Sequence, residues 1–279
     1  MSRKYKEIYE KSINNREEFW QNISENIFWY KKPTKILNSS NPPFYKWFED
    51  GVTNTCYNAL DHHIDQGRGE KLAIIYDSPI TGVQEKITYK NLRERVALFA
   101  GALKKQGVNK GDRVIIYMPM IPEAVIAMLA CGRIGAVHSV VFGGFAANEL
   151  ASRIDDSKAK LIISASCGYE PGRTVHYKPL VNKALELSKH KPDKCIIFQR
   201  NKNKAELDPK MDIAWDESIK NAELADCEKM NANDYAYILY TSGTTGLPKG
   251  IVRDIGGHIV ALKWTMKNIY NIDQDDVWW

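Results

Sequence analysis

The chain has 279 residues, of which 39 are basic and 34 acidic, so its formal net charge is +5. Apolar residues make up 44% and charged residues 26%, a composition that excludes bulk disorder and allows a sizeable core. The basic residues lie in mixed-sign stretches without a basic–aromatic stripe, so no nucleic-acid partner is expected. No apolar run reaches the roughly 18 residues of a membrane span, so no membrane partner is expected either.

The cysteines and the N-terminus indicate a soluble intracellular protein. Five cysteines are widely spaced and include no Cys-x-x-Cys pair, which predicts neither a disulfide framework nor a zinc site. The first 20 residues contain Glu7, Glu10, Glu17 and Glu18 and no apolar core, so we expect neither a signal peptide nor a transit peptide there.

Residues 1–62 differ in sequence pattern from the rest of the chain and are predicted to form a separate N-terminal domain. Apolar residues with helical spacing predict one amphipathic helix over residues 1–23. Prolines at 33, 42 and 43 then interrupt a segment that carries Trp29 and Trp47. We interpret this part as an aromatic arm that packs on a larger body.

Residues 63–279 are predicted to form the start of an α/β domain. Expected strands cover residues 72–76, 113–118, 137–141, 161–164 and 195–198, and expected helices cover residues 89–106, 123–133, 147–156 and 180–189. Such alternation predicts mostly parallel strands with right-handed crossovers and helices on both faces. Residues 202–210 are expected to be a polar surface loop.

The most informative stretch is a strand-like run, residues 235–240, followed directly by a loop over residues 241–250. The loop contains the residues suited to phosphate: Thr241, Ser242, Gly243, Thr244, Thr245, Gly246 and Lys249. Glycines let backbone N–H groups wrap an anion, hydroxyls donate to phosphate oxygens, and an ammonium group neutralises charge. We therefore expect a phosphate-binding loop.

Two alternatives to this interpretation fit less well. A mobile Gly/Ser/Thr linker is not expected directly after a buried-looking strand. A Walker loop needs a second glycine five positions after the first and a Ser or Thr after its lysine. Here Pro248 stands five positions after Gly243, and Gly250 follows Lys249.

The loop resembles the signature of the adenylate-forming superfamily, and further stretches resemble its short-chain acyl-CoA synthetases, above all the propionate-activating branch. These stretches are residues 40–48, 54–61, 116–122, 134–145 and 252–258. The aromatic arm is similar to the N-terminal domain of acetyl-CoA synthetases. The resemblance implies ATP, CoA and Mg²⁺ as cofactors, a short-chain carboxylate as small-molecule substrate, and the mitochondrial matrix or the cytoplasm as location. It also implies that residues 241–246 and Lys249 hold the β- and γ-phosphates of ATP.

A second place resembles a CoA contact of the family. Acetate-type relatives often carry Arg-Gly-Gly-Lys, and the matching positions here are Glu170, Pro171, Gly172 and Arg173. Arg173 keeps the basic end, while Glu170 replaces an arginine and would repel an anion. A Gly-Gly pair within residues 142–145 is explained equally by close approach of a ligand and by tight packing.

No protein metal site is expected. His62, His63 and His138 lack metal-ligand spacing and are interpreted as core or surface histidines. The Mg²⁺ of this chemistry arrives with ATP.

The acyl, adenine and ribose motifs of the family are not found in residues 1–279, so we expect a truncated, N-terminal part of a synthetase. Alone it is expected to be inactive, because it lacks those motifs, and poorly soluble, because the core faces of strands 137–141 or 235–240 would lack later partners. Two hypotheses stay open at this point. The parent is a propionate- or acetate-CoA ligase, or the chain is a non-catalytic polypeptide that binds nucleotide at most.

Overall fold

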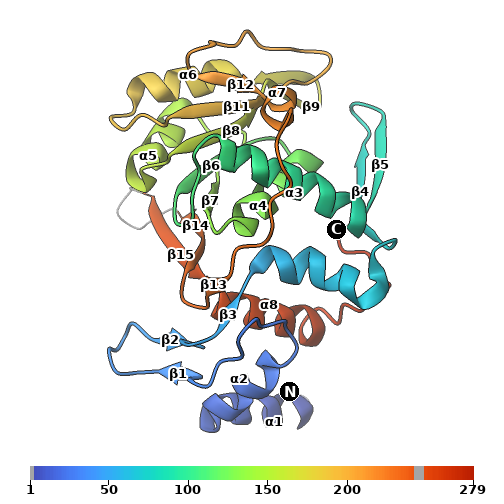
Figure 1. The fold of residues 1–279 in the computed structure, drawn as a ribbon, viewed down its shortest axis with the longest axis vertical. Coiled ribbons are helices and arrows are strands. Elements are labelled where there is room, and N and C mark those ends of the chain that lie inside the picture. The colour runs from blue at the N-terminus through green and yellow to red at the C-terminus, as the bar shows by residue number, and fades with distance from the viewer. Residues whose placement is uncertain (1–2, 242–247) are drawn as a thin grey trace.

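A seven-stranded sheet forms the centre of the molecule in a computed structural model, which describes residues 3–241 and 248–279 (Figure 1). Its strand order is β12-β11-β8-β6-β7-β14-β15. The strands are β6 Arg113–Tyr117, β7 Val137–Val140, β8 Leu161–Ala165, β11 Lys194–Phe198, β12 Asp212–Ala214, β14 Tyr235–Thr241 and β15 Lys249–Asp254. Neighbours from β12 to β14 run parallel, whereas β15 returns antiparallel to β14. The predicted α/β class with a mostly parallel sheet is confirmed.

Helices cover the sheet in two groups, as their crossovers require. The helices are α3 Tyr89–Lys105, α4 Pro122–Arg133, α5 Ala147–Ser157, α6 Tyr177–Leu187 and α7 Trp215–Ile219. Strand β7 lies on one side of β6 and β8 lies on the other, so the chain moves along the sheet in opposite directions in the two connections. Because both crossovers are right-handed, α4 and α5 lie on opposite faces of the sheet. Helices α3 and α7 pack on the same face as α4, and α6 packs on the same face as α5. None of the helices within residues 3–241 and 248–279 is long and apolar enough to cross a bilayer.

The central strands are buried on both faces. Val114, Ile115 and Ile116 of β6 are inaccessible, as are Ile162 and Ile163 of β8. Continuous apolar runs of this kind are typical of parallel strands between two helical layers. The strand order reverses beside β6, and in open α/β sheets ligands usually bind at the carboxyl ends of the strands at such a reversal.

Two of the two-stranded sheets outside the main sheet are hairpins beside the α/β body. β4 Leu72–Ser78 pairs antiparallel with β5 Val83–Thr88, and β9 Cys167–Glu170 pairs antiparallel with β10 Arg173–His176. The sequence predicted a strand at 72–76 but placed it among the parallel strands. That placement was wrong, because Gly82, with φ of +68°, allows a tight turn that folds β5 back onto β4.

The N-terminal arm begins with two helices rather than the single helix expected over residues 1–23. α1 Arg3–Asn14 and α2 Arg16–Ser24 are separated at Asn15, whose φ of −120° and ψ of 49° are not helical. Tyr5 and Tyr9 of α1 stay about half exposed. The predicted apolar side of the helix is therefore buried only from α2 onward.

The rest of the arm packs through aromatic side chains against α8 Gly256–Asn268, as expected. Trp29 and Phe48 are buried, and Trp20 lies edge-on to Trp264 of α8 at a centroid distance of 6.3 Å. The short elements are β1 Leu37–Asn38, β2 Lys46–Trp47, β3 Val52–Thr53, the π-helical turns η1 Tyr57–Asp61 and η2 Ile64–Arg68, and β13 Met230–Asn231, which pairs with β3. The arm is thus joined to the body by a shared core.

Candidate functional site

The predicted phosphate loop is the turn of the β14–β15 hairpin. Thr241 at the end of β14 stands opposite Lys249 at the start of β15 in the antiparallel ladder. Both residues are exposed. The loop residues Ser242, Gly243, Thr244, Thr245 and Gly246 lie outside the described residues. The loop therefore starts at the carboxyl end of a parallel strand.

A clamp of aromatic and charged side chains ties the base of this loop to α5. The Tyr240 hydroxyl donates a hydrogen bond to the Asp156 carboxylate at 2.6 Å. The Arg153 guanidinium lies 5.3 Å from the centre of the Tyr240 ring and 5.0 Å from that of Phe145. Burial, followed by the bond to Asp156, raises the pKa of Tyr240, which keeps its hydroxyl protonated. The last residue before the phosphate loop is thus fixed beside the end of the Gly-Gly turn.

The Gly-Gly turn, residues 142–145, is held by packing as well as by this clamp. A Cβ atom on Gly143 would lie 2.3 Å from the Tyr177 hydroxyl, so only glycine fits without displacing that ring. The Tyr117 hydroxyl donates to the Phe145 carbonyl at 2.7 Å. Burial raises the pKa of Tyr117 to about 12, so this donor keeps its proton at neutral pH. Tight packing alone accounts for Gly143.

The predicted CoA turn is the tip of the β9–β10 hairpin. Glu170 and Arg173 are opposite one another, and Gly172, with φ of +75°, provides the left-handed backbone that the turn requires. The Arg173 guanidinium binds the Glu170 carboxylate at 2.6 Å, although 70% of the arginine side chain is exposed. The charge expected to meet a CoA phosphate is therefore balanced within the turn itself.

A series of contacts connects the base of the phosphate loop, the Gly-Gly turn and the predicted CoA turn. Tyr177, at the start of α6, contacts both hairpin and turn, because a Cβ atom on Gly168 of β9 would lie 2.6 Å from the same hydroxyl that faces Gly143. Sequence reasoning missed Arg153, Asp156 and Tyr177 as parts of this arrangement. Among the residues of this arrangement only Tyr240 could have been found from the sequence, because it directly precedes the predicted phosphate loop.

Two of the histidines considered above, His63 and His138, lie against neighbouring side chains. His63 Nδ1 is 2.9 Å from the Arg68 guanidinium, which occupies the lone pair that a metal would need. Burial lowers the pKa of His138 to about 4, so that ring is neutral at physiological pH. It lies in β7 opposite Tyr237 of β14, with the two rings 5.5 Å apart.

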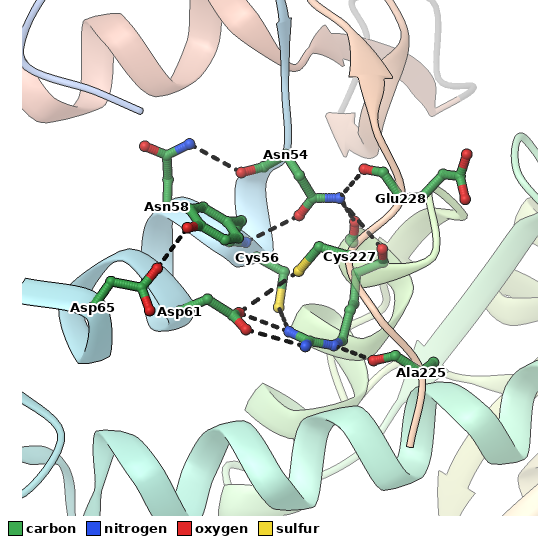
Figure 2. A network of polar contacts seen from close by, with 11 residues as sticks. Asn54, Cys56, Asn58, Asp61, Asp65, Ala225, Cys227 and Glu228 are labelled. Carbon is green, nitrogen blue, oxygen red and sulfur yellow. Dashed lines mark hydrogen bonds and ion pairs between the residues drawn. The ribbon is translucent and has the colours of Figure 1, made fainter. Parts of the chain in front are cut away.

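One group of potential metal ligands occurs within residues 3–241 and 248–279, and an arginine binds two of its three members. The Sγ atoms of Cys56 and Cys227 and a carboxylate oxygen of Asp61 lie within 4.8 Å of one another. Figure 2 shows these three residues close together. The Arg133 guanidinium donates to the Asp61 carboxylate at 2.7 and 3.1 Å and to Cys56 Sγ at 3.6 Å. Because the guanidinium already supplies the positive charge, this group is a buried ion pair rather than a metal site.

The same network joins three distant parts of the chain. Arg133 Nε donates to the Ala225 carbonyl at 2.6 Å, and the Asn54 amide donates to the carbonyls of Gly132 and Glu228, both at 2.9 Å (Figure 2). Side-chain exposure is 5% for Arg133 and 13% for Asp61. The entry to η1, the end of α4 and residues 225–228 are therefore held together by buried polar contacts.

Two family models and several curated proteins match this chain. Residues 60–279 match the family described as AMP-binding enzyme, and residues 5–59 match the acetyl-coenzyme A synthetase N-terminus. The chain is 51% identical over 276 residues to acyl-CoA synthetase short-chain family member 3, mitochondrial, of Rattus norvegicus, covering 99% of this chain and 40% of that protein. It is 43% identical over 282 residues to the acetyl-coenzyme A synthetase of Yersinia pestis, covering 99% of this chain and 43% of that protein.

A solved structure shows the same fold. The acetoacetyl-CoA synthetase from Streptomyces lividans superposes with a TM-score of 0.85 at 24% identity, covering 95% of this chain and 40% of the other. The chain thus spans about 40% of the length of the relatives it matches. Since the family match extends over most of the sequence, the chain belongs to the AMP-binding enzyme family, with an acetyl-coenzyme A synthetase type of N-terminus.

Proposed function

We propose that the whole protein is an AMP-forming acid–thiol ligase that activates a short-chain carboxylate, propionate in the first place and acetate in the second. The carboxylate oxygen attacks the α-phosphorus of ATP and releases pyrophosphate, which leaves an acyl-adenylate. The CoA thiol then attacks the acyl carbon, loses its proton and releases AMP. The supporting observation is the hairpin register that places Thr241 and Lys249 across the phosphate loop, at the carboxyl end of the sheet.

In this proposal the β14–β15 hairpin binds the β- and γ-phosphates of ATP. The Lys249 ammonium neutralises charge on the departing pyrophosphate, and Thr241, with the loop residues that follow it, donates hydrogen bonds. Their contribution is positioning and charge stabilisation, because no proton has to move at the phosphates. Arg153 and Tyr240 keep the base of the loop in place. Mg²⁺ is proposed to enter with ATP, because it prefers phosphate oxygens and water to a cage of protein ligands.

The proposed organisation has an N-terminal domain in residues 1–62 and the AMP-binding domain in residues 63–279. The proposed partners are small molecules only: the carboxylate, ATP and CoA. The proposed location is the mitochondrial matrix or the cytoplasm. The rat relative supports the matrix, since its name places that protein in mitochondria.

The function is tested by carboxylate-dependent ATP–pyrophosphate exchange in the whole protein. We expect exchange only when an acid is present, with a higher kcat/KM for propionate than for acetate or butyrate. CoA should be consumed in a separate step that forms a thioester and AMP. Exchange that does not depend on any of the three acids, or no exchange at all, would contradict the proposal.

Removing each charge of the β9–β10 turn in turn tests the CoA contact. Arg173→Ala should raise the apparent KM for CoA several-fold and leave ATP–pyrophosphate exchange unchanged, because only the second step uses CoA. Glu170→Gln should lower that KM, since it releases the guanidinium that Glu170 now binds.

The paired variants share one turn, so opposite effects exclude a general loss of folding. Equal losses in both half-reactions would assign Arg173 a structural role instead.

A further inference from the structure

Two cysteines that the chemistry described so far does not use lie together in the network around Arg133. Cys56 directly precedes η1 and is fully buried, whereas Cys227 lies between α7 and β13 and is partly exposed. Their Sγ atoms are within 4.8 Å of one another, and Figure 2 shows the two sulfur atoms side by side. A disulfide needs an S–S distance of about 2 Å, so a shift of roughly 3 Å or less, shared by two side chains, would join them.

The backbone around Cys227 allows this shift. Residues 222–229 belong to no helix or strand, so a movement of Cys227 breaks no regular secondary structure. The segment is nevertheless held on both sides of the cysteine. The Ala225 N–H donates to the Ala97 carbonyl at 3.0 Å, and the Glu228 N–H donates to the Arg133 carbonyl at 2.7 Å. The thiol of Cys227 is therefore kept beside Cys56.

The charged groups of the network treat the two thiols differently. The Arg133 guanidinium donates to Cys56 Sγ at 3.6 Å, and a nearby cation favours the thiolate form of a cysteine. Cys227 Sγ instead donates to the Asp61 carboxylate at 3.6 Å. A hydrogen bond with Cys56, together with burial, raises the pKa of Cys227, which keeps that thiol protonated. Cys56 is thus suited to act as nucleophile and Cys227 as the thiol that resolves the product.

Two other cysteines show the usual effect of burial. Burial raises the pKa of Cys131 and of Cys195 to about 12, so both stay protonated at neutral pH. A protonated, buried thiol reacts slowly with oxidants, because the thiolate is the reactive form. Oxidation is therefore expected to select the pair beside Arg133.

We propose that Cys56 and Cys227 form a peroxide-sensitive pair, which closes to a reversible disulfide between the N-terminal arm and the α/β body. The oxidant is hydrogen peroxide, which is small enough to reach the pair past the partly exposed Cys227. Disulfides inside cells are mostly transient and redox-sensing, and this one would tie residues 225–228 to the start of η1.

The reaction has two steps. Cys56 sulfur attacks one peroxide oxygen, the O–O bond breaks, and hydroxide leaves with the thiol proton as water, which gives a sulfenic acid. Cys227 sulfur then attacks the sulfenic sulfur of Cys56, the S–O bond breaks, and hydroxide leaves with the second thiol proton as water. Two thiols are oxidised to one disulfide, and one peroxide is reduced to two water molecules.

The test treats the reduced whole protein with a small molar excess of hydrogen peroxide, alkylates the remaining thiols in denaturant and digests without reductant. Mass spectrometry should find the peptides of Cys56 and Cys227 joined, and dithiothreitol should separate them. Cys131 and Cys195 should be recovered as alkylated thiols. The oxidised protein should also melt several degrees above the reduced form, because the cross-link restricts the unfolded chain.

Three variants separate this pairing from general oxidation. Cys227→Ser should lose both the cross-link and the shift in melting temperature, and its Cys56 should accumulate as sulfenic acid or higher oxides. Cys56→Ser should form no cross-link at Cys227. Cys167→Ser is the matched control, since it removes another buried cysteine and should cross-link as the unmodified protein does. Recovery of Cys56 and Cys227 as alkylated thiols after peroxide, or a cross-link that forms only in urea, would overturn the proposal.

Discussion

Replacing Lys249 by alanine is expected to slow acid-dependent ATP–pyrophosphate exchange about 100-fold in the whole protein. Loss of one positioned charge donor from a developing anion costs on the order of 3 kcal/mol of transition-state stabilisation. The ammonium group stands on an exposed strand end, opposite Thr241, where the proposed pyrophosphate would lie. Carboxylate binding should change little, because the acid does not contact this hairpin in the proposal.

Two further variants define what the lysine contributes. Arg253→Ala removes a cation from the same strand, opposite Tyr237 and away from the loop, and should leave the exchange rate unchanged. Lys249→Arg keeps the charge and should retain more activity than the alanine variant. An unchanged rate in Lys249→Ala would remove this residue from the chemistry.

Replacing Asp61 by asparagine is expected to lower the free energy of unfolding by about 3–5 kcal/mol, because it leaves the buried Arg133 guanidinium without a counter-charge. The cost of a desolvated, unpaired charge exceeds that of the lost hydrogen bonds. Urea unfolding measures the change directly. Glu186→Gln is the control, because it breaks an exposed ion pair with Lys183 and should lower the free energy of unfolding by less than about 1 kcal/mol.

A compensating variant tests the explanation. Asp61→Leu combined with Arg133→Met removes both charges and should recover much of the stability, as apolar replacement of buried pairs often does. If Asp61→Asn were no more harmful than Glu186→Gln, the network in Figure 2 would not be a stabilising element.

Much of the α/β body was predictable because its signals are local. Helix α3 begins after Thr88, whose side chain accepts a hydrogen bond from the Asn91 N–H, and ends before Gly107, whose φ is +79°. Strands β6 and β8 are short and mostly apolar runs, and their ends were predicted to within one residue. Parallel pairing followed from the intervening helices.

The failures arose where a tertiary partner decides the outcome. The helical spacing of residues 1–23 continues through Asn15, but only the part from α2 onward has an aromatic core to pack against. Strand β4 has the composition of a sheet strand, and its actual partner depends on the turn at Gly82. The periodicity of a sequence shows which side of a helix or strand is apolar, but it does not show which other element packs against that side.

In the candidate site, too, some residues could be predicted from the sequence and others could not. The loop that ends at Lys249 is contiguous, so its residue types pointed to phosphate without any structure. Arg153 and Tyr177 are single residues far from that loop in sequence, and their significance depends on which groups lie beside them. Sequence spacing carries no information on such contacts.

The network around Arg133 also bears on how the chain can be divided. The two family matches meet between residues 59 and 60, inside η1. Asn54 on one side of that boundary binds backbone on the other, and Asp61, two residues beyond it, holds the guanidinium beside Cys56. A cut there would separate Asn54 and Cys56 from the buried arginine that they surround. The line that separates two sequence families is therefore a poor place to transplant or exchange modules, and a viable junction has to keep residues 54–61 with α4.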